Sequence, residues 1–245
     1  MKNFSVADRG ESLADQVYRQ LATGILEGRY SPGERVNIRS LAEAIGVSQT
    51  PVREAITRLL SEGVLCTVGR AIEVPQVDAK DLEELFRLRL MLEGELAERA
   101  APHVKQEMME TASKIQEELD EAIAKRDFKR SLQLNVQFHF SLYRAARQPI
   151  TLQLVEKLWL LIGPSMNMMY PALASMRSTR HTGVLDAMRT KNASELRKAI
   201  EADIHTAQAS MQSLQSILEA QALATADHAV AVRRPVGRPR KIMGA

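Results

Sequence analysis

The sequence has little of several residue types, and each scarcity excludes a class of protein. One cysteine, Cys66, stands among its 245 residues, so no internal disulfide framework can form and a reducing compartment is expected. The 12 glycines and 9 prolines make up about 9% of the chain against a usual ~12%, which disfavours a turn-rich β fold. Hydrophobic residues still reach 45%, which is enough for a buried core.

Long apolar runs are also missing. The longest dense run, Leu158 to Ile162, is far shorter than the ~20 residues that cross a bilayer. The first residues lack the apolar stretch of a signal peptide. We therefore expect a soluble cytoplasmic protein without a membrane partner.

Acidic residues are absent from the C-terminal segment 228–245, which carries five arginines and lysines. The whole chain has a formal charge of +3, so the residues before this segment are close to neutral overall. A basic tail of this kind is typical of nucleic-acid binding or of a solvated end.

The first 75 residues alternate between helical and strand-like patterns. Apolar residues recur every four positions over 11–27, and a second short stripe covers 38–45. A third helix is expected to begin with Thr50 as N-cap and Pro51 at its first helical position. Residues 64–74 then alternate around a glycine, as in a short hairpin. This order predicts a winged helix-turn-helix.

The third helix would leave one polar face free for a major groove. Gln49, Thr50, Arg53 and Thr57 lie on that face, and their side chains suit hydrogen bonds to phosphates and base edges. The alternative is that Thr50 and Arg53 only cap and solvate the helix.

The remaining chain is helical in pattern. The expected helices are 79–101, 105–125, 128–147, 150–162, 174–190 and 193–222, with breaks at Gly163-Pro164 and Pro171 among others. The fold class is therefore mainly α, with an N-terminal winged helix-turn-helix and a C-terminal all-α helical bundle. The expected divisions are a winged helix-turn-helix DNA-binding domain 1–75, a linker 76–80, an all-helical domain 81–222, and a basic tail 223–245.

Four polar residues interrupt the apolar stripes of these helices. Asn135 and His139 lie one turn apart on one face, His181 falls in a second stripe and Asp203 in the stripe of the last helix, whereas His205 does not. A buried carboxylate is costly unless it is paired or bound to metal. The four groups therefore indicate either a shared metal ion or a satisfied hydrogen-bond network.

Two segments resemble a known family. The stretch from Leu41 to Leu65, LAEAIGVSQTPVREAITRLLSEGVL, is similar to the DNA-binding signature of GntR-family bacterial transcription regulators. The helical part resembles the FadR-type effector domain, the FCD class, through Arg89-Leu-Met-Leu-Glu93 and Asn135-Val-Gln-Phe-His139. The resemblance implies a homodimer that binds a two-fold double-stranded operator and responds to a small organic acid, with residues 81–222 as the effector-binding and dimerisation domain.

The resemblance also implies which residues meet DNA. The expected contacts are Arg39, Ser48, Gln49, Thr50, Arg53 and, at the hairpin tip, Gly69. Gln49 departs from the arginine that the family often has there, which shifts the expected base preference from guanine towards adenine.

In the helical domain, the resemblance implies a divalent metal site. Its ligands would be Asn135, His139, His181 and Asp203, with Asp203 at the position of the family's third histidine. These donors suit Zn, Ni, Mn or Fe. Arg89 would anchor the effector's carboxylate, or else form only a surface ion pair with its neighbour four residues on.

The tail resembles an AT-hook. Its core is Gly237, Arg238, Pro239 and Arg240, residues that suit the narrow minor groove of A/T-rich DNA. A solvated disordered end is the alternative.

Two other functions fit parts of the pattern. Two histidines and a carboxylate also suit a metal-dependent enzyme acting on a small organic acid. A chromosome-binding protein that uses the tail would bind DNA without responding to an effector.

Overall fold

The computed structural model describes residues 11–173 and 181–232. The AT-hook residues Gly237, Arg238, Pro239 and Arg240 lie outside these ranges, as does the first part of the expected helix 174–190. Within the described residues, no helix has the length and apolar character needed to cross a membrane.

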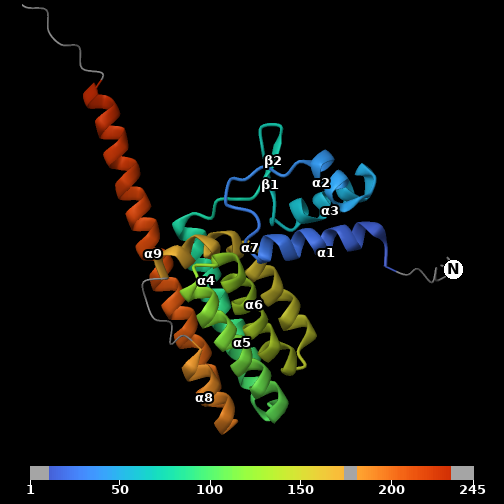
Figure 1. The fold of residues 1–245 in the computed structure, drawn as a ribbon, viewed down its shortest axis with the longest axis vertical. Coiled ribbons are helices and arrows are strands. Elements are labelled where there is room, and N and C mark those ends of the chain that lie inside the picture. Colours follow the sequence, from blue (N-terminus) through green and yellow to red (C-terminus); the bar gives the residue numbers. More distant parts are fainter. Residues whose placement is uncertain (1–10, 174–180, 233–245) are drawn as a thin grey trace, which may run out of the picture.

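A winged helix-turn-helix forms the N-terminal part, as the sequence predicts (Figure 1). Its elements are α1 (Leu13–Leu26), α2 (Ile38–Ile45), α3 (Gln49–Ser61), β1 (Cys66–Val68) and β2 (Ala71–Glu73). Ser12 caps α1 by accepting a hydrogen bond from the Asp15 amide. The strands pair antiparallel with Val68 opposite Ala71, so two residues make the tip of the wing.

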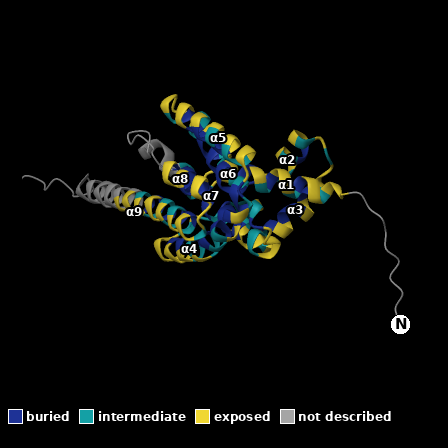
Figure 2. Cartoon of the chain, turned by 90° about the horizontal axis from the view of Figure 1, so that it is seen from below, coloured by how far each residue is buried: buried dark blue, intermediate teal, exposed yellow. Residues whose placement is uncertain are grey.

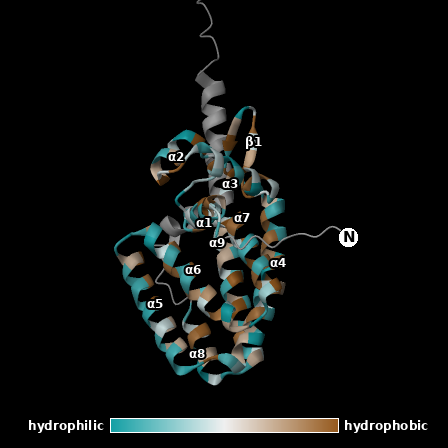
Figure 3. Ribbon diagram, turned by 90° about the vertical axis from the view of Figure 1, so that its right-hand side faces the viewer, coloured by the Kyte–Doolittle hydropathy of each residue, from teal (hydrophilic) through white to brown (hydrophobic). Residues whose placement is uncertain are grey.

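A helical bundle follows, and it also agrees with the predicted fold class. It consists of α4 (Ala79–Ala100), a 3-10 turn (Ala101–His103), α5 (Gln106–Ala124), α6 (Phe128–Ala145), α7 (Pro149–Leu173), α8 (Thr182–Thr190) and α9 (Ala193–Val232). α6 is mostly buried, whereas α5 keeps an exposed outer face (Figure 2). That outer face of α5 is also hydrophilic (Figure 3). α6 is therefore the central helix on which functional side chains can be enclosed.

Two hydrophobic clusters fill the molecule, and α7 joins them. One cluster belongs to the bundle and includes Trp159, Ile162 and Met166 of α7. The other belongs to the winged helix and includes Leu160 of the same helix. Successive residues of α7 thus pack into different cores.

Three expected helix boundaries are wrong. α7 does not break at Gly163-Pro164 or Pro171 but continues to Leu173. The reason at Gly163 is tertiary contact: a Cβ there would lie 3.3 Å from backbone atoms of α1, so glycine allows the two helices to approach closely. Burial of α7 in both clusters outweighs the hydrogen bond that Pro164 removes.

The other two corrections concern α9 and α3. α9 extends ten residues past 222, through a segment rich in alanine, the residue with the highest helix propensity. Ser48, not Thr50, is the N-cap of α3. Pro51 consequently occupies the third helical position, where its missing N–H still has no intrahelical partner to lose.

Candidate functional site

The exposed face of α3 carries the side chains expected to meet DNA. Gln49, Thr50 and Arg53 are all exposed, and Arg53 Nη2 donates to Gln49 Oε1 at 3.1 Å. The opposite face of α3 is fixed in the winged-helix core by Val52, Ala55, Ile56 and Leu59. The core therefore holds the helix while the polar face stays open to a ligand.

Three further expected DNA contacts flank this face. Ser48 is exposed and makes no capping bond through its side chain, so its hydroxyl is available. Arg39 on α2 is 80% exposed and pairs with Glu43 at 3.0 Å, an ion pair worth little at such exposure. Gly69 at the tip of the wing has φ +62°, a conformation that favours glycine.

A second constellation lies inside the bundle. His139 on α6, His181 just before α8, and Asp203 on α9 come together from segments far apart in the sequence. His139 Nε2 lies 3.3 Å from Asp203 Oδ2 and 3.2 Å from His181 Nε2. Each residue offers one ligand atom within 4.8 Å of the others.

The remaining two predictions about this region concern Asn135 and His205. Asn135 is 2% exposed and stands one turn before His139 on α6, on the same side of the helix. Its part as a fourth ligand stays a prediction. His205 is exposed on α9, as expected for a residue off the apolar stripe.

Neighbouring hydrogen bonds fix the tautomer of His139. The Tyr143 hydroxyl donates to the Glu93 carboxylate at 2.6 Å, so its oxygen is left to accept from His139 Nδ1 at 3.1 Å. Burial raises the pKa of Tyr143 well above its usual value, and the Glu93 charge adds to this, so the hydroxyl keeps its proton at neutral pH. His139 then carries its proton on Nδ1 and presents a lone pair on Nε2.

A matching arrangement fixes His181. Gln116 Nε2 donates to Asp120 at 2.8 Å, which orients the amide so that its Oε1 faces His181 Nδ1 at 2.6 Å. Nδ1 must donate to that oxygen, and Nε2 again bears the lone pair. Both histidines thus turn their acceptor nitrogens towards Asp203.

These donors fit a divalent ion. Ligand atoms about 2.1 Å from one ion, at angles of about 90–110°, are roughly 3.0–3.4 Å apart. The two shortest separations in the cluster fall in that range. Two imidazole nitrogens and a carboxylate are ligands for zinc, nickel, manganese or iron. The same distances also suit a metal-free network in which one imidazole is protonated and donates to the other.

Arg89 is buried, which excludes the surface ion pair considered from the sequence. Its side chain is 1% exposed, and Nε contacts Glu93 Oε1 at 2.5 Å while Nη2 lies 3.3 Å from Oε2. Burial alone would lower the pKa of Arg89, but the Glu93 charge and hydrogen bond outweigh it and raise the pKa. The guanidinium also lies over the Trp159 ring, 4.5 Å from its centroid.

A continuous polar chain therefore runs from Arg89 through Glu93 and Tyr143 to His139. Sequence reasoning missed Tyr143 and Gln116 as partners of the histidines. Tyr143 stands four residues after His139, a spacing that could have signalled the contact. No local signal points to Gln116, because it comes from α5.

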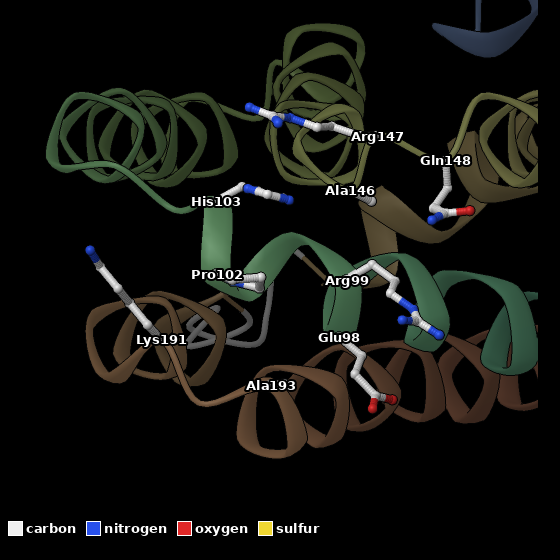
Figure 4. A pocket seen from close by; sticks show the side chains of 9 residues that line it. All are labelled: Glu98, Arg99, Pro102, His103, Ala146, Arg147, Gln148, Lys191 and Ala193. Carbon is white, nitrogen blue, oxygen red and sulfur yellow. The ribbon is translucent and has the colours of Figure 1, made fainter.

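A separate cavity of about 560 Å³ lies at the ends of α4 and α6 and at the α8–α9 junction (Figure 4). Lys191 and Arg99 line it but point away from each other (Figure 4). None of the histidine–aspartate group lines this cavity. It is therefore distinct from the buried centre.

Comparisons with known proteins agree with this architecture. Residues 13–71 match the family described as bacterial regulatory proteins, gntR family, and residues 84–206 match the FCD domain. The HTH-type transcriptional regulator McbR of Escherichia coli strain K12 is 31% identical over 171 residues, which are 69% of this chain and 77% of that protein.

Solved structures give the same result. The E. coli McbR/YncC structure superposes with a TM-score of 0.75 at 29% identity, covering 86% of this chain and 99% of that one. A GntR transcriptional regulator from Rhodococcus sp. RHA1 has a TM-score of 0.68 at 20% identity over 83% and 99% of the two chains, a likeness of fold.

A winged helix-turn-helix with an open polar recognition face, joined to a helical bundle, defines a DNA-binding transcription regulator. The chain belongs to the GntR family of bacterial transcription regulators, with a C-terminal FCD domain of the FadR type. Its relatives are transcription regulators and not enzymes, so the enzyme alternative has no support from them.

Proposed function

We propose that this regulator binds a divalent ion through Asn135, His139, His181 and Asp203, and that a small organic acid binding to that ion changes its affinity for DNA. The observation that carries the proposal is the convergence of two Nε2 lone pairs and a carboxylate in a buried site. When bound, the ion supplies open coordination positions for a carboxylate oxygen.

Arg89 is the proposed second anchor for the acid. Nε and Nη2 of Arg89 donate to the Glu93 carboxylate, whereas Nη1 faces Met166 Sδ, a weak acceptor, at 4.0 Å. That nitrogen is the one suited to a carboxylate oxygen. The Glu93 pair holds the guanidinium in place for this contact.

The route from this centre to the DNA-binding part passes through the end of α1. Gln133, on α6 with His139, donates to Glu27 at 3.0 Å. Asn167 on α7 donates to the Gly28 carbonyl at 3.0 Å. Helices α6 and α7 therefore hydrogen-bond to the end of α1, which positions the winged helix. A shift of either helix would move the end of α1.

DNA recognition is proposed to use Arg39, Ser48, Gln49, Thr50, Arg53 and Gly69. Two copies of the chain would place two such faces on a two-fold operator, with half-sites about one helical turn apart or less. We propose that residues 1–75 form the DNA-binding unit, 76–80 the linker, and 81–222 the effector-binding and dimerisation unit.

The test is operator binding, followed by fluorescence anisotropy of labelled DNA, with Zn²⁺ and a panel of organic acids. We expect at least one acid to shift operator affinity in the wild-type protein, and His139→Ala to remove that shift. His205→Ala is the matched control, since His205 is exposed on the same helix as Asp203, and it should respond as the wild type does. A full response in His139→Ala would contradict the proposal.

A further inference from the structure

The bundle contains a buried hydrogen-bond donor for which the described residues offer no acceptor. Trp159 on α7 is 1% exposed, and its Nε1–H has no hydrogen-bond partner within the residues that the structure describes. Nearly all buried polar groups in native proteins are paired, and leaving one unpaired is costly. An N–H in this state indicates that an acceptor other than the described residues belongs beside it, and we take it to be a bound molecule.

Trp159 lies beside the proposed effector site, so the missing acceptor is an atom of the effector. Its ring lies 4.5 Å from the Arg89 guanidinium carbon and 5.2 Å from the His139 ring, centroid to centroid. The indole thus lies close to both the proposed effector anchor and a proposed metal ligand. Phe140, edge-on at 5.5 Å, holds the ring in this place.

Charge decides which oxygen the donor suits. The ion and Arg89 are both cationic, so carboxylate oxygens of the effector are drawn to them. Once the ion and Arg89 engage the carboxylate oxygens, the indole N–H, which only donates, is left for a further oxygen of the same molecule, such as a hydroxyl or keto oxygen.

We propose that Trp159 Nε1–H donates a hydrogen bond to a neutral oxygen of the effector, and that the regulator is therefore selective for hydroxy- or keto-carboxylates over plain carboxylates. The inference rests on the proposed function, since it needs a carboxylate in the buried centre. Within that function, the inference assigns Trp159 as the residue that recognises the hydroxyl or keto oxygen of the effector.

The spectroscopic test uses the native chain. Trp159 is the single tryptophan of the sequence, so the indole fluorescence of the protein reports this site alone. We expect malate, added to the zinc-loaded protein, to shift the emission to longer wavelength as the N–H gains an acceptor. Succinate differs from malate by lacking the hydroxyl, and it should leave the emission wavelength unchanged.

The binding test compares Trp159→Phe, which keeps an aromatic ring and removes the donor, with the wild type by calorimetry. Loss of one hydrogen bond should weaken malate binding about 10-fold and leave succinate binding unchanged. Direct chelation of the ion by the malate hydroxyl is the same in both proteins and cancels in this comparison. Tyr18→Phe, which removes a partly buried hydroxyl in the winged helix and leaves the bundle intact, is the control and should keep the wild-type ratio of the two affinities.

The outcomes separate the two proposals. Equal affinity ratios in wild type and Trp159→Phe, or an emission wavelength that malate does not move, would overturn the role of Trp159 alone. A wild-type protein that binds neither acid in the presence of zinc would overturn the carboxylate site, and this inference with it. The emission measurement needs no variant, so the test stands even where the phenylalanine protein fails to fold.

Discussion

Replacing Tyr143 by phenylalanine removes one oxygen on which the tautomer of His139 depends. The hydroxyl donates to Glu93 at 2.6 Å and accepts from His139 Nδ1 at 3.1 Å, and all three side chains are buried. In the variant the Nδ1–H has no acceptor, and a carboxylate oxygen loses its donor.

The magnitude follows from these two lost contacts. A buried donor left without a partner costs about 1–3 kcal/mol, so the free energy of unfolding should fall by about that amount. Partners that orient a ligating histidine are typically worth about 10–100-fold in metal affinity, because they keep the ring and its lone pair aimed at the ion. Zinc affinity should fall by a factor in that range.

The assay is a zinc titration of the full chain against a chromophoric chelator, beside urea unfolding of the metal-free protein. Tyr18→Phe is the matched control. The Tyr18 hydroxyl donates to Glu62 at 2.6 Å in the winged helix, far from the ligands in the fold, so its loss should lower stability and leave zinc affinity unchanged. Unaltered zinc affinity in Tyr143→Phe would refute the assignment of the His139 tautomer.

Three further predictions concern the other parts of the molecule. Gly163→Ala should lower the free energy of unfolding by about 1–3 kcal/mol in urea titrations, because its Cβ meets the α1 backbone, whereas Gly183→Ala, with open space around it, should raise it by up to about 1 kcal/mol. Arg53→Ala should cost about 1–3 kcal/mol of operator affinity and alter the base preference. Arg39→Ala should weaken binding to all DNA sequences equally and flatten the salt dependence of binding. Anisotropy titrations that find neither change would contradict the DNA contacts. Deleting 233–245 should reduce binding to A/T-rich competitor DNA and preserve the effector response, and equal competition by A/T-rich and G/C-rich DNA before and after deletion would exclude an AT-hook.

The winged helix could be predicted because its signals are local. Apolar residues at helical spacing, followed by alternation around Gly69, determine the order of elements before any tertiary contact is known. The continuation of α7 could not be predicted in this way. Gly163 and Pro164 usually end a helix, and only the close approach of α1 and the burial of α7 in two cores explain why the helix continues.

The candidate centre could likewise be predicted only where its signals are local. The inward positions of His139, His181 and Asp203 follow from their apolar stripes, and the structure brings these three together. Their hydrogen-bond partners Glu93 and Gln116 come from α4 and α5, and helix periodicity does not indicate which helices become neighbours. The same limit applies to Arg89, whose burial depends on the packing of α4 against α7.

The most direct test of the metal centre is anomalous diffraction from a zinc-soaked crystal of the full chain, with data on both sides of the zinc absorption edge. We predict an anomalous peak about 2.0–2.2 Å from the Nε2 atoms of His139 and His181 and from a carboxylate oxygen of Asp203. Absence of a peak there, with the two Nε2 atoms still about 3.2 Å apart and joined by a hydrogen bond, would contradict it.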